Sequence, residues 1–252
     1  MDLNQKMFYP LKDYEEINEK IYKLIRDMSE KRMKEKAKYT RMDLPRGTGN
    51  KELTLYFAYL FGLRISEALM VLENLYIHLS KKKTNDGQIY YVLHAPNLKQ
   101  KGNAPKEKII FLFPQNEYEK KMWDFIEKNY YNGSTKVLKR NNISMFCKKL
   151  KTTFIGYEKV KENGKIVLKE VIKESHLNPH SLRHMRAYVL FQRYGDIELV
   201  RKMLGWKDER MLYYYVALSK SIEEMELEKR FLQHIPKKEK KKEKDKQNIL
   251  EQ

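Results

Sequence analysis

Two arginines, a histidine and a run of three tyrosines are the side chains of this chain whose chemistry is easiest to name. Arg64 lies in the stretch Gly-Leu-Arg-Ile-Ser-Glu, Arg183 follows His180 by three residues, and the tyrosines occupy positions 213–215. Attack on a phosphodiester adds negative charge to its non-bridging oxygens, and two guanidinium groups can bind those oxygens while staying charged at any working pH. A tyrosine could be the nucleophile, and a histidine could bind the phosphate or move a proton. The set therefore indicates phosphoryl transfer.

The spacing of the histidines also has to be compared with that of a metal site. His180 and Arg183 are one helical turn apart and share a helix face, and His184 follows His180 at the i, i+4 spacing used by zinc-protease helices. Such a helix needs Glu directly after the first histidine, where this chain has Ser181, and the single Cys147 cannot supply a cluster of ligands. We therefore expect no metal. There is also no Gly-rich phosphate loop, so no nucleotide or other cofactor is expected.

The charge of the chain favours a nucleic-acid partner. It has 52 Lys and Arg against 34 Asp and Glu, a formal net charge of +18, and its pI is about 9.6. Residues 237–252 contribute seven Lys and four Asp or Glu, only +3 of that total. The rest of the chain is therefore basic in its own right.

Composition also limits the class of protein. With 252 residues, of which 41% are hydrophobic, the chain can bury a real core. One cysteine excludes an internal disulfide, and the N-terminus lacks the apolar stretch of a signal peptide. No apolar run approaches the ~18 residues that a membrane-spanning helix needs. These features predict a cytoplasmic protein that does not contact a membrane.

The first third of the chain is predicted to be helical. From Tyr14 to Lys38 apolar residues recur every three to four positions, which is typical of an amphipathic helix; they are Ile17, Ile21, Leu24, Ile25 and Met28. Pro and two Gly within residues 43–50 break this pattern and mark a boundary. Further helices are predicted at about Lys51–Phe61, ending at Gly62, and at about Ser66–Glu73.

Between Leu75 and Phe113 the pattern changes to that of strands. Three stretches are rich in β-branched and aromatic residues, and turn-prone segments separate them; the stretches are Leu75–Leu79, Ile89–His94 and Lys108–Phe113. They predict a three-stranded antiparallel meander.

Helices are predicted to dominate again after this sheet. The predicted helices are about Asn116–Tyr130 and Ile143–Phe154, then one from Pro179 to Gly195, one from Asp196 to Gly205, and one with Asp208 as candidate cap that carries the tyrosines. A short hairpin is predicted around Glu162–Lys165, where Asn-Gly suits a tight turn. The predicted fold is therefore mainly α with a small three-stranded antiparallel β-sheet.

Four short sequence boxes occur in a characteristic order and at characteristic distances. They are residues 62–67 (Gly-Leu-Arg-Ile-Ser-Glu), 99–103 (Lys-Gln-Lys-Gly-Asn), 180–184 (His-Ser-Leu-Arg-His), and 204–206 (Leu-Gly-Trp) followed nine residues later by Tyr215. Together they resemble the catalytic domain of the tyrosine recombinase (phage-type integrase) superfamily over roughly residues 50–232. The joint pattern is far more specific than any one box.

The resemblance implies a metal-free mechanism and a set of catalytic residues. Tyr215 would attack a DNA phosphate to give a 3′-phosphotyrosyl linkage, and Lys101, in the β-hairpin turn, would protonate the leaving 5′-oxygen. The indole N–H of Trp206 could donate to the phosphate, although it cannot transfer a proton as the histidine more common at that place could. The implied catalytic residues are Arg64, Lys101, His180, Arg183, Trp206 and Tyr215.

Several of these assignments have alternatives. The same lysine-rich turn could present Lys99 instead of Lys101, and Trp206 could be a core residue. His184 could orient His180 or be an ordinary core histidine. Glu67 is expected to form a structural salt bridge with Arg64.

The predicted domains are a short N-terminal helical segment (1–45), a catalytic domain (46–234) and a charged disordered tail (235–252). The predicted function is site-specific recombination of double-stranded DNA, with a homotetramer assembled on the DNA. Relatives usually carry a DNA-clamping domain of about a hundred residues before the catalytic domain. Only Met1–Asn50 precede the region of resemblance here, which leaves target recognition open. The alternatives are relaxation of supercoils in the manner of a type IB topoisomerase, and DNA binding without catalysis.

The segment after the tyrosines has an apolar stripe among charged residues, formed by Ile222, Met225, Phe231 and Leu232. It could pack on its own domain. The resemblance implies the other possibility, in which it docks on a neighbouring protomer.

Overall fold

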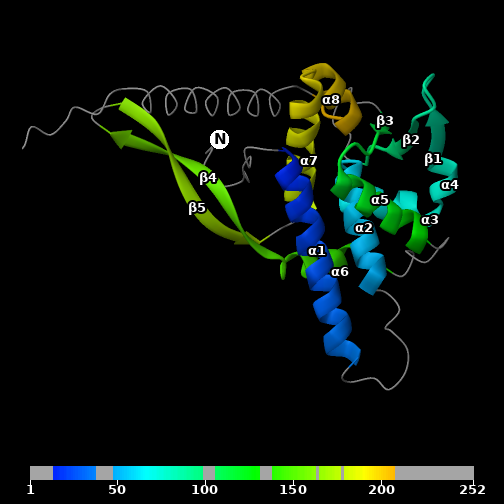
Figure 1. The fold of residues 1–252 in the computed structure, drawn as a ribbon, viewed down its shortest axis with the longest axis horizontal. Helices are drawn as coiled ribbons and strands as arrows, with labels where there is room; N and C mark the ends of the chain where they lie inside the picture. The colour runs from blue at the N-terminus through cyan, green and yellow to red at the C-terminus, as the bar shows by residue number, and fades with distance from the viewer. Residues whose placement is uncertain are drawn as a thin grey trace, which may run out of the picture. The chain divides into compact units, whose positions relative to one another are not determined.

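Helices form most of the described structure, as the sequence predicts (Figure 1). The structure is a computed structural model and describes residues 14–37, 48–98, 106–130, 138–162, 165–176 and 179–207. All of these residues belong to one unit, Met1–Leu212.

Eight helices and five strands lie within the described residues. The helices are α1 (Tyr14–Ala37), α2 (Thr48–Leu60), α3 (Ile65–Glu73), α4 (Leu75–His78), α5 (Glu117–Asn129), α6 (Arg140–Cys147), α7 (Pro179–Tyr194) and α8 (Ile197–Leu204). The strands are β1 (Leu79–Lys83), β2 (Ile89–Pro96), β3 (Glu107–Leu112), β4 (Lys151–Glu162) and β5 (Lys165–His176). β1, β2 and β3 form an antiparallel sheet in that order, and β4 and β5 form a separate two-stranded sheet. The predicted fold class is confirmed, with the second sheet added to it.

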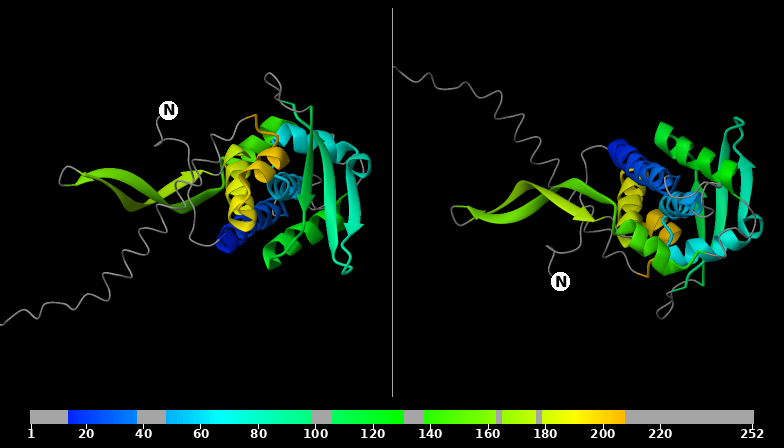
Figure 2. Two further views of the ribbon diagram at one scale, coloured as in Figure 1. Left: turned by 90° about the horizontal axis from the view of Figure 1, so that it is seen from above. Right: turned by 90° about the horizontal axis from the view of Figure 1, so that it is seen from below.

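α2 is the central helix of the core. Every residue from Glu52 through Phe61 is buried, and α2 packs against α1, α3, α5 and α7 (Figures 1 and 2). A helix that is apolar on all sides belongs inside a domain. α1 covers it with Ile17, Ile21 and Ile25, all buried, and Tyr59 donates a 2.8 Å hydrogen bond to the side-chain oxygen of Asn18. The C-terminal end of α2, from which the chain continues to Arg64, is therefore held firmly in the core.

A buried cluster of charges fixes α7 against α5. Glu119 of α5 is completely buried, and its Oε1 accepts hydrogen bonds from Arg186 and from Arg193, the latter at 3.0 Å. Burial alone would raise the pKa of Glu119, but the two arginines together lower it. The carboxylate is therefore charged at neutral pH, and it holds the helix that carries His180 and Arg183.

The three-stranded sheet has one buried face. In β3 the side chains alternate between exposed and buried, and the buried ones are Lys108, Ile110 and Leu112. α8 packs against β3, and α3 packs against β2. A lysine thus occupies a position on the side of the sheet that faces the helices.

Most of the predicted helix boundaries agree with the structure. α1, α5, α7 and α8 begin and end within two residues of their predicted bounds. Asp196 caps α8 as predicted, since its side chain accepts a 2.9 Å hydrogen bond from the backbone N–H of Leu199.

The prediction of a strand at Leu75–Leu79 is wrong. Leu75–His78 forms the one-turn helix α4, and β1 begins only at Leu79. The backbone N–H of Leu75 donates a 3.0 Å hydrogen bond to the hydroxyl of Tyr130 at the end of α5. This tertiary contact and the burial of Leu75 outweigh the β propensity of the segment.

The prediction of a helix at Ile143–Phe154 is wrong in its second half. α6 ends at Cys147, and β4 already includes Thr152, Thr153 and Phe154. The predicted short hairpin is in fact twelve residues long on each side, paired from Lys151↔His176 to Glu162↔Lys165. β-branched and aromatic residues along both strands favour this extended pairing.

No single helix among the described residues is both long and apolar enough to cross a membrane. Asn50–Leu60 and Ile65–Glu73 meet that criterion only as a pair, which is bent by 112°.

Candidate active site

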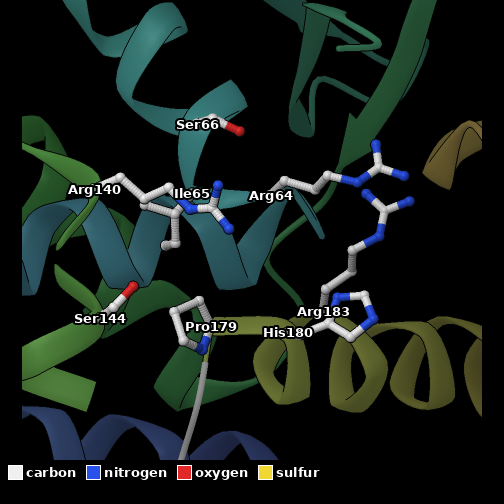
Figure 3. A pocket seen from close by; sticks show the side chains of 8 residues that line it. All are labelled: Arg64, Ile65, Ser66, Arg140, Ser144, Pro179, His180 and Arg183. Atoms are coloured by element: carbon white, nitrogen blue, oxygen red, sulfur yellow. The ribbon is translucent and has the colours of Figure 1, made fainter. Parts of the chain in front are cut away.

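Two of the sequence boxes, residues 62–67 and 180–184, converge on one cavity of about 280 Å³ (Figure 3). Arg64 comes from the turn before α3, and His180 and Arg183 come from the first two turns of α7. The residues that line the cavity are Arg64, Ile65, Ser66, Arg140, Ser144, Pro179, His180 and Arg183. None of these lining side chains is acidic.

Three helices direct their N-terminal ends at this cavity. The first residues of α3, α6 and α7 are Ile65, Arg140 and Pro179, and all three line it. Each helix N-terminus has unpaired backbone N–H groups and a partial positive charge. The backbone and the arginine side chains therefore both favour an anion in this place.

Arg64 is held by a carboxylate that is itself buried. Its Nη1 donates to Oε1 of Glu67 at 2.6 Å and to the side-chain oxygen of Asn97 at 3.2 Å. The backbone N–H of Arg64 donates to the other oxygen of Glu67 at 2.9 Å, which caps α3. The predicted salt bridge between Arg64 and Glu67 is therefore present. About a fifth of the Arg64 side chain remains exposed.

Arg183 is fixed by backbone carbonyls and is almost fully buried, with 1% of its surface exposed. It donates to the carbonyl of Gly62 at 2.7 Å and to the carbonyl of Leu204. These carbonyls lie where α2 and α8 end, and helix ends leave carbonyls without intrahelical partners. Arg183 thus ties the first arginine box to the box that contains Trp206.

Sequence reasoning missed a buried lysine beneath the arginines. Nζ of Lys108 lies 2.5 Å from Oε2 of Glu67, and both side chains are completely buried. Burial and then the charge of Arg183 lower the pKa of Lys108 from 10.5 to about 7, although Glu67 opposes the shift. The strand pattern contained the signal, since Lys108 shares its face with Ile110 and Leu112.

The lysine fits only because a glycine lies beside it. Gly205 has a positive φ of 63°, and a Cβ atom built on it would lie 2.8 Å from the Lys108 side chain. The carbonyl of Gly205 also accepts a 3.2 Å hydrogen bond from the side-chain amide of Asn97. The base of the β2–β3 hairpin and the end of α8 therefore meet under the arginines.

The buried cations outnumber the buried carboxylates around Glu67. Burial alone would raise the pKa of Glu67, but Lys108, the backbone N–H of Arg64 and the charge of Arg183 lower it. One carboxylate thus faces two arginines and a lysine whose pKa is lowered to about 7. This excess of positive charge favours binding of an anion such as a phosphate in the cavity.

The histidines form a pair beside the cavity. The rings of His180 and His184 are nearly perpendicular, with centroids 4.4 Å apart. Burial and then the charges of His180 and Arg183 lower the pKa of His184 to about 4. His184 is therefore neutral at pH 7 and adds no charge next to His180.

Trp206 packs on the second arginine. Its ring centroid lies 5.6 Å from Cζ of Arg183 and 6.4 Å from the ring of His184. Trp206 is half-buried, and the guanidinium over its ring makes a cation–π interaction. The structure thus brings Arg64, His180, Arg183 and Trp206 together.

The family profile that matches this sequence covers residues 42–221 and is that of the phage integrase family. The chain belongs to this family. The structure resembles two solved complexes of the XerH site-specific recombinase. One is the pre-cleavage complex with difH substrate, at 16% identity and a TM-score of 0.43, covering 80% of this chain and 48% of that one. The other is the post-cleavage complex with palindromic difH, at 16% identity and a TM-score of 0.46, covering 84% and 51%. This chain thus spans about half the length of those proteins, and no curated protein matches its sequence.

Two predicted catalytic residues of this phage-integrase-family chain lie outside the described residues. They are Lys101, with its rival Lys99, and Tyr215, with its neighbours Tyr213 and Tyr214. On either side of residues 99–105, the backbone N–H of Asn97 donates a 2.9 Å hydrogen bond to the carbonyl of Lys106. The choices between the lysines and among the tyrosines stay predictions.

The described part of this integrase-family chain contains no group of three or more His, Cys, Asp or Glu side chains that could hold a metal ion. The metal-free reaction stays a prediction, because the arrangement of these side chains does not test the reaction itself.

Proposed function

We propose that this chain is a site-specific DNA recombinase that breaks and rejoins strands through a tyrosine. The observation that carries the proposal is the fixed pair Arg64 and Arg183, which share the buried Glu67 at the edge of a cavity that also receives His180. Membership of the phage integrase family supports it. The substrate is double-stranded DNA, consistent with the net charge of +18.

In the proposed reaction the phenolic oxygen of Tyr215 attacks the phosphorus, and the bond from phosphorus to the 5′-oxygen breaks. Lys101 gives a proton to that leaving oxygen, so that a 3′-phosphotyrosyl linkage and a free 5′-hydroxyl result. The reverse attack by the 5′-hydroxyl of another strand restores the phosphodiester and the tyrosine. The energy of the broken bond is kept in the phosphotyrosyl bond, so no nucleotide cofactor is needed.

The described residues stabilise the charge that develops in this reaction. Arg64, which is partly exposed, and Arg183, which is held by two carbonyls, stay in place while the phosphate passes through its transition state. A donor that is fixed beforehand loses no energy to reorganisation during the reaction. His180, which is exposed at the cavity, would hydrogen-bond the phosphate or accept the phenolic proton.

The test is formation of a covalent protein–DNA adduct on a nicked duplex, in EDTA, with the DNA that flanks this chain's own coding sequence. Wild-type protein should give the adduct, Tyr215→Phe should lose it, and the matched Tyr213→Phe and Tyr214→Phe variants should keep it. An adduct that survives Tyr215→Phe but not one of the neighbouring variants would move the nucleophile.

The two alternative functions are outcomes of related assays. Relaxation of supercoiled DNA without recombinant products would indicate a type IB topoisomerase activity. DNA binding by a folded protein that never forms an adduct would indicate a non-catalytic binding protein. Assembly as a tetramer on DNA is part of the proposal and is measured by sedimentation of the complex.

A further inference from the structure

A third arginine enters the cavity from a different element. Arg140 is the first residue of α6, and its side chain is exposed. Among the described residues, none accepts a hydrogen bond from Arg140 or forms an ion pair with it. In Figure 3 its guanidinium reaches into the cavity from the side opposite to the guanidinium groups of Arg64 and Arg183. This positive group is therefore not explained by the contacts that hold the other two arginines.

α6 fixes the backbone position of this arginine. Its residues Ile143, Phe146 and Cys147 are completely buried, and the helix packs against both α3 and α7. Those are the helices at whose N-terminal ends Arg64 and Arg183 lie. The Cα of Arg140 is thus held by its helix relative to the other two arginines.

We propose that Arg140, together with the hydroxyl groups of Ser66 and Ser144, binds the DNA phosphate next to the one held by Arg64 and Arg183. Both serines line the cavity and are half-buried, one on α3 and one on α6. Hydroxyl and guanidinium groups are the usual protein ligands of DNA phosphate oxygens. Successive phosphates of one strand are offset by about 3.4 Å along the helix axis. The phosphate next to the one held by Arg64 and Arg183 is therefore within reach of an arginine on an adjacent helix. The proposal rests on the DNA-binding function proposed above.

A single phosphate could not bind all three guanidinium groups equally well. Arg183 is nearly buried and directed by the carbonyls of Gly62 and Leu204, and Arg64 is directed by Glu67. Arg140 approaches from the other side of the cavity, in which no acidic side chain offsets its charge. A second anion in the cavity would pair with the Arg140 guanidinium, and the continuous backbone of the DNA supplies that anion as a neighbouring phosphate.

The test pairs protein variants with DNA in which one phosphate at a time is replaced by an uncharged methylphosphonate. Non-covalent affinity is measured for wild type, Arg64→Gln and Arg140→Gln on each DNA, so that every pair gives a double-mutant cycle. Arg140→Gln should weaken binding to unmodified DNA about tenfold and lower the slope of log affinity against log salt by about 1. On the DNA that lacks its partner phosphate, Arg140→Gln and wild type should bind alike.

The matched control is Lys139→Gln, which removes an exposed charge from the residue before Arg140 that does not line the cavity. It should show no coupling to any single phosphate. The proposal requires that Arg140 couples to a different phosphate from Arg64, and that the two phosphates are adjacent. Coupling of both arginines to one phosphate, or no coupling of Arg140 to any, would overturn it. Failure of wild type to bind DNA at all would overturn the proposed function instead.

Discussion

The buried Lys108 should make the free energy of unfolding of the wild-type protein rise with pH. Replacing Lys108 by methionine should remove this rise. In the folded protein the pKa of Lys108 is about 7, because burial and then Arg183 disfavour its charge, whereas in the unfolded chain it is 10.5. Below pH 7 both states hold the proton, so stability does not depend on this group there. Between pH 7 and pH 10.5 the unfolded chain holds more protons than the folded protein, so the free energy of unfolding rises with pH.

The size of this effect follows from the two pKa values. Each unit of pKa difference corresponds to about 1.4 kcal/mol. The lysine is half protonated in the folded protein at pH 7 and nearly neutral at pH 9, while it stays mostly protonated in the unfolded chain at both values. The free energy of unfolding should therefore rise by roughly 2 kcal/mol between pH 7 and pH 9 through this one residue.

The assay is reversible urea unfolding of wild type and Lys108→Met at pH 7, 8 and 9. Methionine is unbranched and similar in length, so it fits the space beside Gly205 without adding a charge. The difference between the two proteins should grow by about 2 kcal/mol in favour of wild type over this range, since the variant lacks the titrating group. Two curves that stay parallel would show that Lys108 titrates normally and would refute the account of its burial.

Two further predictions concern Gly205 and Lys101. In urea unfolding, Gly205→Ala should lose ~1–3 kcal/mol more stability than the matched Gly195→Ala. Both glycines have a positive φ, but only at Gly205 would the new Cβ contact Lys108. Equal losses in the two variants would contradict the tight contact. Lys101→Ala should fail to cleave an ordinary duplex but should regain cleavage when sulfur replaces the leaving 5′-oxygen, because sulfur leaves without protonation. Rescue of Lys99→Ala instead would assign the role of general acid to Lys99.

The sequence was sufficient to predict the parts of the site that depend on local spacing. His180 and Arg183 share a face because α7 runs from Pro179, and Arg64 lies at the start of α3 because Gly62 ends the preceding segment. The salt bridge of Arg64 with Glu67 is a contact within one helical turn. Such features need only the period of a helix and the chemistry of its ends.

Other features depend on contacts between distant segments and could not be read in this way. The partners of Arg183 are the carbonyls of Gly62 and Leu204, which no spacing within α7 reveals. Lys108 is a surface residue by its type, and only the buried face of β3 places it under Glu67. α4 forms where the residue types favour a strand, because the hydroxyl of Tyr130 binds the start of that turn. In each case a tertiary contact outweighs a local preference.

The most direct test of the central claim is to locate the DNA on the protein by mass spectrometry after cleavage. Trypsin should release the peptide Met211–Lys220, which contains all three consecutive tyrosines, and fragmentation of the nuclease-trimmed adduct shows which one is modified. The account predicts a nucleotide joined through its 3′-phosphate to Tyr215 in wild-type protein, and no modified peptide when Arg64 or Arg183 is replaced by glutamine. A nucleotide on Tyr213 or Tyr214, a linkage through a 5′-phosphate, or a folded protein that binds DNA and yields no modified peptide would contradict it.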